Sequence, residues 1–314
     1  MTARRSRFRL VSLALGVVGA GIAVALVVND DAARDALKGI AFPVVALILL
    51  LQFVNVAADS VRYRMVLPER YRAMTGRWSW HRIFAVGRLL NALIPQAGTA
   101  YRVANLRIAQ GMPVSTFFGS VAVMTWLGNA MVMVFAGIGV LVAGSLFGAL
   151  ILGAGVSLIG LIIVGPRFWV ARAGRAKGVP SRIASTLARF GESFVELAHR
   201  PKQLRAVVGM SLVTQVSGAA AFVVVCSALG IEDAFAVGAM IYSATAITSV
   251  VSLTPAGIGV TELAAGLAGG LLDIGAALGV LVALVIRVTG FVAVSVLAGS
   301  AAVLEARDRR SEPL

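Results

Sequence analysis

Long apolar runs, separated by short polar segments, dominate the pattern of the chain. A helix needs about 20 predominantly apolar residues to cross the hydrocarbon core of a bilayer. Six runs approach or exceed that length and are predicted to be spans: Leu10–Val28, Ile40–Ala58, Ser115–Val142, Leu146–Val164, Ala206–Leu229 and Gly275–Leu304. A cleaved signal peptide is the alternative for the first run, since Ala23-Val24-Ala25 resembles a cleavage site, but its length favours a retained helix.

Proline and glycine interrupt the apolar pattern at two further places. The first break is LIPQAGTAYR, at Leu93–Arg102, and the second is SLTPAGIGVTE, at Ser252–Glu262. Pro95 stands 160 residues before Pro255. Each break lies between two apolar segments: Ile83–Ile94 and Tyr101–Ala109 for the first, Ala234–Leu253 and Ile258–Leu272 for the second.

Both breaks are predicted to be re-entrant hairpins. Pro95 and Pro255 cannot donate a backbone hydrogen bond to a helix, and Gly257 and Gly259 accept backbone angles that other residues resist. A broken backbone survives at membrane depth only where it is buried in protein or lines a watery cavity. A pair of interfacial helices is the alternative for the first break. Residues 234–253 are long enough to make the second hairpin a deep one.

The composition indicates an all-α polytopic membrane protein with little left for a soluble domain. The chain has 314 residues, of which 59% are hydrophobic and 13% charged, and its mean hydropathy is +0.92. That balance is too apolar for a soluble protein. Cys226 is the only cysteine, which excludes an intrachain disulfide. His81 and His199 are isolated from other metal-ligating residues, so neither a metal nor another cofactor is expected.

The distribution of charge predicts which loops face the cytoplasm. A net charge of +14 would suggest nucleic acid as a partner of a soluble protein. In a membrane protein it marks cytoplasmic loops instead. Of the 28 basic residues, 22 fall in segments 1–9, 60–82, 165–206 and 305–314. Acidic residues dominate the other polar loops: Asp30, Asp31, Asp35, Glu232, Asp233 and Asp273. Both termini are therefore expected on the cytoplasmic side of the cytoplasmic membrane, and no nucleic-acid partner is expected.

The order of elements repeats along the chain. Each half is predicted to contain two spans, a hairpin and a third span, and the halves begin on opposite sides of the membrane. We therefore expect one transmembrane domain over residues 1–314, an inverted-repeat helical bundle with halves at about 10–142 and 146–304. Six full spans and two broken hairpins make up this bundle. Such repeats place the binding site near mid-membrane, where the broken elements meet.

The longest cytoplasmic loop, residues 165–206, contains an apolar stripe at helical spacing. The pattern predicts a helix that lies in the headgroup layer. A helix packed under the bundle is the alternative. The stripe consists of Ile183, Leu187, Phe190, Phe194 and Leu197.

Two charges in apolar segments are the leading candidates for chemistry. Arg287 lies near the middle of the last span, and Glu262 is the only carboxylate inside the predicted hairpins. An isolated charge at a helix centre costs about 2.5–3.5 kcal/mol, so each is expected to be the other's partner. The pair could fix helix register. Alternatively, Arg287 could hold a phosphate through its bidentate fork, near the free N–H groups of a broken helix end.

The first hairpin supplies a second set of candidates. Arg88 and Arg102 are predicted to form a cytoplasm-facing seat for the same headgroup, with interfacial snorkelling as the alternative. The predicted substrate-binding residues are Arg287, Glu262, Gly257, Gly259, Pro255, Arg88, Asn91, Arg102, Pro95 and Gly98.

The second break resembles a motif of the flippase-like family typified by the transmembrane region of lysylphosphatidylglycerol synthases. The family pattern Pro-x-Gly-x-Gly-x-x-Glu is present as Pro255, Gly257, Gly259 and Glu262. An arginine is also usual in the last span of the family, and Arg287 is similar to it. The resemblance covers nearly the whole chain.

The first motif of that family is kept only in part. Pro95, Gly98 and Arg102 match it, but Thr99 stands where the family tends to have glutamate. In the third span, uncharged residues stand where the family often has a Glu-Arg pair and a following aspartate: Thr125, Trp126 and Asn129. These departures remove carboxylates that a charge relay or ion coupling could use.

The resemblance implies movement of an anionic or glycosylated lipid, such as a phospholipid or a polyprenyl phosphate, between leaflets. Membrane lipids are then the expected partners, and the oligomeric state is left open, with a homodimer as one option. No enzyme activity is expected, and the aminoacyl-transferase domain that some members of the family carry is expected to be absent, since nothing soluble follows Leu314. The alternatives are a membrane-embedded transferase on a lipid-linked substrate, using Asp30 and Asp31, and a small-anion transporter with an occluded cavity.

Overall fold

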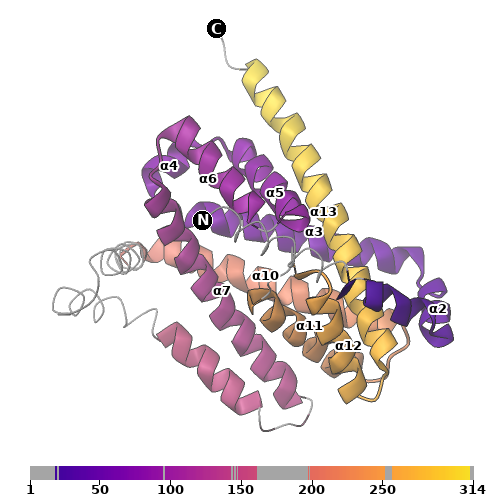
Figure 1. Cartoon of the computed structure of the whole chain (residues 1–314). Coiled ribbons are helices and arrows are strands. Elements are labelled where there is room, and N and C mark those ends of the chain that lie inside the picture. Colours follow the sequence, from indigo (N-terminus) through magenta and orange to yellow (C-terminus); the bar gives the residue numbers. More distant parts are fainter. Residues whose placement is uncertain are drawn as a thin grey trace, which may run out of the picture.

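A computed structural model shows a helical bundle (Figure 1). It describes residues 18–19, 21–94, 96–142, 144, 146, 148–160, 197, 199–251 and 257–311. Within these ranges the regular structure is helical, and no strand occurs. The all-helical architecture expected from the hydrophobic pattern is confirmed for this part of the chain.

Four helices are long and apolar enough to cross a membrane: α3 (Phe42–Met65), α7 (Val114–Val142), α10 (Pro201–Ala228) and α13 (Ala276–Ser311). They correspond to four of the six predicted spans, and they mark a multi-pass membrane protein. The other two predicted spans, Leu10–Val28 and Leu146–Val164, fall partly outside the described residues. Their described parts are helical at 21–28 and at Gly148–Gly160.

Both predicted breaks separate two helices. The first lies between α5 (Arg77–Leu93) and α6 (Ala97–Gln110), and the second lies between α11 (Ala234–Val251) and α12 (Val260–Leu271). Gly257 and Gly259 have φ angles of 71° and 84°. These are left-handed values that glycine adopts without a steric penalty, so the expected role of both glycines is confirmed. Pro95 and Pro255 lie outside the described residues.

The second predicted span belongs to a helix that is longer than the apolar run. The hydropathy pattern places it at Ala58, with a cytoplasmic loop from residue 60, but α3 continues to Met65. The charged residues of its last two turns have partners inside the protein. Arg62 pairs with Asp59, and Arg64 donates to the carbonyls of Arg72 and Thr75. A helix can carry these charges because their partners offset the loss of solvation.

Two short helices complete the described structure. α2 (Asp31–Lys38) begins at the N-cap residue Asp30, whose carboxylate accepts a 2.8 Å hydrogen bond from the Ala33 N–H. α4 (Glu69–Met74) follows α3. Of the predicted loop 165–206, residues 165–196 and 198, with most of the predicted interfacial helix, lie outside the described residues. Its last residues belong to α10, which begins at Pro201, where proline is tolerated in the first helical turn.

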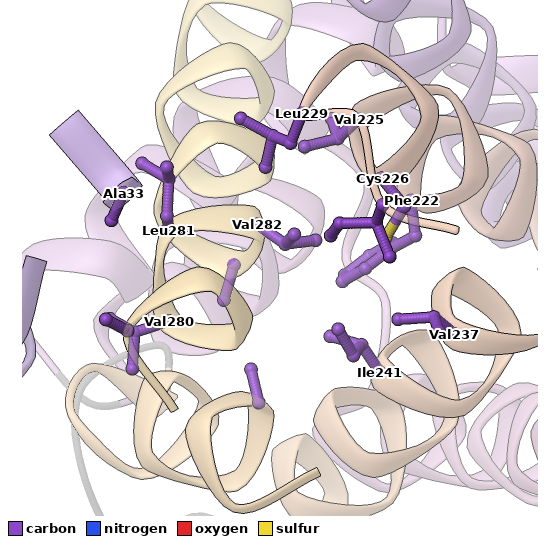
Figure 2. Packing of buried hydrophobic residues seen from close by; sticks show 14 of the residues in the cluster. Ala33, Phe222, Val225, Cys226, Leu229, Val237, Ile241, Val280, Leu281 and Val282 are labelled. Atoms are coloured by element: carbon purple, nitrogen blue, oxygen red, sulfur yellow. The ribbon is translucent and has the colours of Figure 1, made fainter. Parts of the chain in front are cut away.

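The helices of the two halves interlock. α3 packs along α10, α13 packs against both α5 and α12, and α11 packs against α7. In one buried cluster, side chains of α10 face those of α11 and α13; Phe222, Ile241 and Val282 are examples (Figure 2). Because lipid tails are as apolar as these side chains, close packing stabilises such contacts more than transfer from water does. The bundle therefore brings both broken hairpins against α13.

Candidate functional site

A cavity of about 270 Å³ lies between the two hairpins. Its wall includes residues of α3, α5, α10, α11, α12 and α13. Much of the wall is apolar, with Val56, Leu89, Phe222, Ile286 and Phe291 among its residues. The described polar residues of the wall are Gln52, Arg88, Thr245, Thr261 and Arg287. One space therefore has both a hydrocarbon-like surface and two guanidinium groups.

Arg287 on α13 and Glu262 on α12 form the predicted ion pair. The Nε of Arg287 donates to Glu262 Oε1, and its Nη2 donates to Thr261 Oγ1. The Gly259 N–H donates to Glu262 Oε2 over 2.7 Å, so Glu262 also caps the first turn of α12. The second break therefore positions the carboxylate that holds Arg287.

Glu262 and Arg287 differ in their access to the cavity. The side chain of Glu262 is 2% exposed and that of Arg287 is 19% exposed. Arg287 and Thr261 are among the described residues of the wall, whereas Glu262 lies behind them. Of these two predicted binding residues, Arg287 therefore lies on the described wall and Glu262 does not. Glu262 acts on the cavity through Arg287 and the backbone of the break.

A second charged group, centred on Asp59 of α3, adjoins the same cavity. Asp59 Oδ1 accepts from Arg62 Nη2 over 2.5 Å, and Oδ2 accepts from Arg88 Nη1 over 3.2 Å. Arg62 also lies 3.4 Å from the hydroxyl of Ser211 on α10. Asp59 and Arg62 are buried, while the side chain of Arg88 is 39% exposed. Asp59 thus holds Arg88 at the cavity wall, much as Glu262 holds Arg287.

The sequence analysis missed Asp59 and Arg62 because both were placed beyond the end of a span. A signal for them does exist. Polar residues recur at helical spacing along the second apolar run, at Gln52, Asn55, Asp59 and Arg62. Such spacing places side chains on one face of a helix, which indicates a polar face that continues past Ala58.

Arg88 and Arg102, which were predicted to form one seat, differ in their access to the cavity. Arg88 lines the cavity with Arg287. Arg102 is buried between α5 and α6, and its guanidinium carbon lies 4.8 Å from the ring centre of Phe84 and 5.3 Å from that of Tyr63. Both distances permit cation–π attraction. The guanidinium carbon of Arg88 lies 6.0 Å from the centre of the same Phe84 ring. Arg88 is among the described residues that line the cavity, and Arg102 is not.

Asn91 and Gly98 hold the first hairpin together. The Gly98 N–H donates to Asn91 Oδ1 over 2.7 Å. A Cβ atom at Gly98 would lie 1.6 Å from the carbonyl oxygen of Gly87, so α5 and α6 approach more closely than any other residue would permit. Their contacts fix the orientation of α5, the helix that carries Arg88.

His81 on α5, outside the four spanning helices, is not a further cation for this site. Its Nδ1 lies 2.8 Å from the hydroxyl of Ser60. Burial, together with the positive charges of the nearby Arg77 and Arg64, lowers the pKa of His81 to about 4. The imidazole is therefore neutral at physiological pH.

Residues 10–298 match the family model described as the lysylphosphatidylglycerol synthase TM region. The match includes both breaks and the residues that form the cavity wall. No curated protein and no solved structure matches the chain.

Proposed function

Because the chain belongs to the lysylphosphatidylglycerol synthase TM-region family, we propose that it is a flippase-like transporter of anionic or glycosylated lipids in the cytoplasmic membrane. The family indicates a function related to membrane lipids. The observation that carries the proposal is a cavity lined by two arginines. Arg88 comes from α5 of the first hairpin, and Arg287 comes from α13, which packs against α12 of the second. The proposed activity is transport and involves no catalytic step.

The chemistry of the wall suits an amphipathic ligand. Guanidinium groups match phosphate oxygens with paired N–H donors. The apolar residues around them suit the first methylene groups of a lipid. Asp59 and Glu262 keep the two guanidinium groups in place without facing the cavity. In the proposed complex, the headgroup phosphate lies between Arg88 and Arg287, and the chains remain in the bilayer.

The packing of the helices supports an inverted repeat of residues 10–142 and 146–304. If the halves correspond, then α3 corresponds to α10, α5 corresponds to α11 and α7 corresponds to α13. The contact of α5 with α13 then has its counterpart in the contact of α11 with α7, and the contact of α3 with α10 is its own counterpart. In such transporters two repeats rock about a fixed site and expose it to each side in turn. We propose the same motion here, with six spans and two hairpins.

The distribution of charge supports a topology with both termini in the cytoplasm. Glu232, Asp233 and Asp273 line a second cavity, of about 860 Å³, which we assign to the outer side. The basic residues Arg70 and Arg72, and those at the start of α10 (Arg200, Lys202 and Arg205), are assigned to the cytoplasmic side, in accord with the positive-inside rule.

The alternative of a membrane-embedded transferase has weaker support. Its candidate residues, Asp30 and Asp31, have structural partners in α2. Asp30 caps the helix, and Asp31 pairs with Arg34 on the exposed surface. General acid–base catalysis would require groups that lie within hydrogen-bonding reach of a bound substrate, and these two carboxylates are already used to form the helix.

The proposal is tested by lipid movement in reconstituted vesicles. A fluorescent phosphatidylglycerol analogue should exchange between leaflets in the presence of the protein, as measured with a membrane-impermeant quencher. Replacing Arg88 by Gln should slow this exchange by about tenfold or more, the factor expected for loss of a charge-assisted hydrogen bond of about 1.5 kcal/mol or more. Asp59 retains Arg62 in that variant, so the fold should persist.

Arg107→Gln is the matched control, because Arg107 lies in the last turn of α6 and is exposed. It should exchange lipid at the parental rate. The proposal is wrong if neither phosphatidylglycerol nor a glycolipid moves faster with the parent protein than in protein-free vesicles. The assigned seat is wrong if Arg88→Gln and Arg107→Gln behave alike.

A further inference from the structure

The described polar groups on the cavity wall are either positively charged or neutral. Arg88 and Arg287 are cations, and Gln52, Thr245 and Thr261 are neutral. No carboxylate occurs among the described residues of the wall. The undescribed stretch between Val251 and Gly257 contains no aspartate or glutamate in its sequence. The described part of the wall therefore offers hydrogen-bond donors to an anion and no counter-ion to a cation.

The nearby carboxylates are engaged behind the wall. Asp59 is shared by Arg62 and Arg88, and its side chain is 12% exposed. Glu262 accepts from Arg287 and from the Gly259 N–H. An ammonium group in the cavity would have to compete with these arginines for their partners. It would also face two like charges, and like-charge juxtaposition opposes binding.

The size of the cavity favours a compact headgroup. Sites for small molecules commonly enclose about 300–1,000 Å³, and this cavity, at about 270 Å³, is near the lower end. A phosphate with one small alcohol suits this volume better than an oligosaccharide. The amide of Gln52 can bond an alcohol, and so can the hydroxyl of Thr245, which donates to the Tyr242 carbonyl and still has acceptor capacity. The hydroxyl of Thr261 already bonds Gly257, Glu262 and Arg287.

We propose that the cavity selects lipids with a compact phosphodiester headgroup that carries hydroxyls and a net negative charge, and that it excludes headgroups bearing an amine. This inference rests on the proposed function and specifies its substrate class. The discrimination arises because an amine would be buried without a counter-ion, whereas a phosphodiester is complementary to Arg88 and Arg287.

The test compares two headgroups that share a phosphodiester and differ in the amine. Vesicles contain fluorescent phosphatidylglycerol or fluorescent phosphatidylethanolamine at equal density in a neutral phosphatidylcholine bilayer. Phosphatidylglycerol should exchange at least about tenfold faster, the ratio that corresponds to about 1.4 kcal/mol. Native mass spectrometry of the parent protein should show the same order of binding.

The possible outcomes separate this inference from the proposed function. If both lipids exchange and bind equally, lipid transport stands and the selectivity is wrong. If neither lipid moves and neither binds in preference, the selectivity is wrong, and the proposed function is wrong as well if a glycolipid also moves no faster than in protein-free vesicles. Soluble glycerol 3-phosphate is the probe for a free ligand. If vesicles take it up faster than they exchange phosphatidylglycerol, the lipid headgroup is the wrong source of the phosphate.

A variant of the wall should reduce the preference for phosphatidylglycerol. Gln52 lines the cavity and is 7% exposed, so Gln52→Glu adds a carboxylate of nearly the same shape. The ratio of phosphatidylethanolamine to phosphatidylglycerol exchange should rise about tenfold, in line with the pairing of the amine with the new carboxylate. Gln96→Glu is the matched control, because Gln96 is exposed in the first break, and its ratio should not change. If a folded Gln52→Glu variant keeps the parental ratio, the charge of the wall does not set the selectivity. If the variant fails to fold, the comparison of the two headgroups with the parent protein decides whether the selectivity is right.

Discussion

Arg287 and Glu262 can stabilise the fold, bind a ligand, or do both, and single substitutions do not separate these roles. Removing one member of a buried pair leaves an uncompensated charge, whereas removing both does not. We therefore expect Arg287→Gln to lower the free energy of unfolding by about 3–5 kcal/mol, because Glu262 is 2% exposed. The double variant Arg287→Gln with Glu262→Gln should recover most of that loss. Thermal melting in detergent measures both.

Lipid exchange by the double variant then decides the role of the arginine. It should fold and yet fail to move phosphatidylglycerol, because α13 then places no guanidinium on the described cavity wall for the phosphate. Arg287→Lys should also exchange slowly, since one ammonium cannot reproduce the separate bonds from Nε and Nη2 to Glu262 and Thr261. Parental exchange by a well-folded double variant would show that the pair is structural only.

The sequence anticipates the partner of Arg287 but not that of Arg88. Glu262 is the one carboxylate in a predicted hairpin, so a pair with Arg287 follows from the cost of two isolated charges. Asp59 lies beside a basic stretch, where positive charge normally indicates a loop. Arg62 lies one helical turn from it on α3, but only the tertiary structure shows that Arg88 of α5 also pairs with it. Charge compensation across helices depends on packing, which hydropathy does not report.

At the scale of helices, the first hairpin depends on the contact between Gly87 and Gly98. A Cβ at residue 98 would lie 1.6 Å from the Gly87 carbonyl oxygen, so Gly98→Ala must push α5 and α6 apart. We expect a loss of about 1–3 kcal/mol or more in stability, together with slower lipid exchange because α5 carries Arg88.

Gly209→Ala is the control for that substitution. Gly209 lies within α10, and nothing lies within 4 Å of a Cβ built there. Alanine should raise the stability slightly, since it favours a helix interior over glycine by about 0.5–1 kcal/mol. Denaturant or thermal unfolding of both variants provides the comparison. If Gly98→Ala unfolds at the same midpoint as Gly209→Ala, α5 and α6 do not approach each other as closely as the Gly87–Gly98 contact requires.

The existence of the elements follows from the sequence more reliably than their ends. Proline and glycine locate both breaks, because they remove a donor or permit left-handed angles, and Gly257 and Gly259 adopt such angles. The start of α5 at Arg77 and the end of α3 at Met65 lie well inside segments read as a polar loop. There, side-chain partners satisfy polar groups that hydropathy counts as exposed.

At the scale of the whole molecule, the interlocking of the halves explains how one cavity receives side chains from both. α5 of the first half packs on α13 of the second, and α11 of the second packs on α7 of the first. A relative movement of the halves would therefore change the positions of Arg88 and Arg287 with respect to each other. That geometry suits a carrier whose phosphate seat is complete only in some of its states.

The proposed topology predicts opposite sides for two exposed glutamates. Between Glu69 and Glu232 the chain should cross the membrane three times, through α7, the segment that includes Gly148–Gly160, and α10. Both residues are exposed, and Cys226, the only cysteine, is buried. In a Cys226→Ala background, Glu232→Cys should react with a membrane-impermeant maleimide on intact cells. Glu69→Cys should react only after permeabilisation, because its basic surroundings mark the cytoplasmic side. Equal labelling of both residues on intact cells would place them on the same side of the membrane and would contradict the inverted repeat.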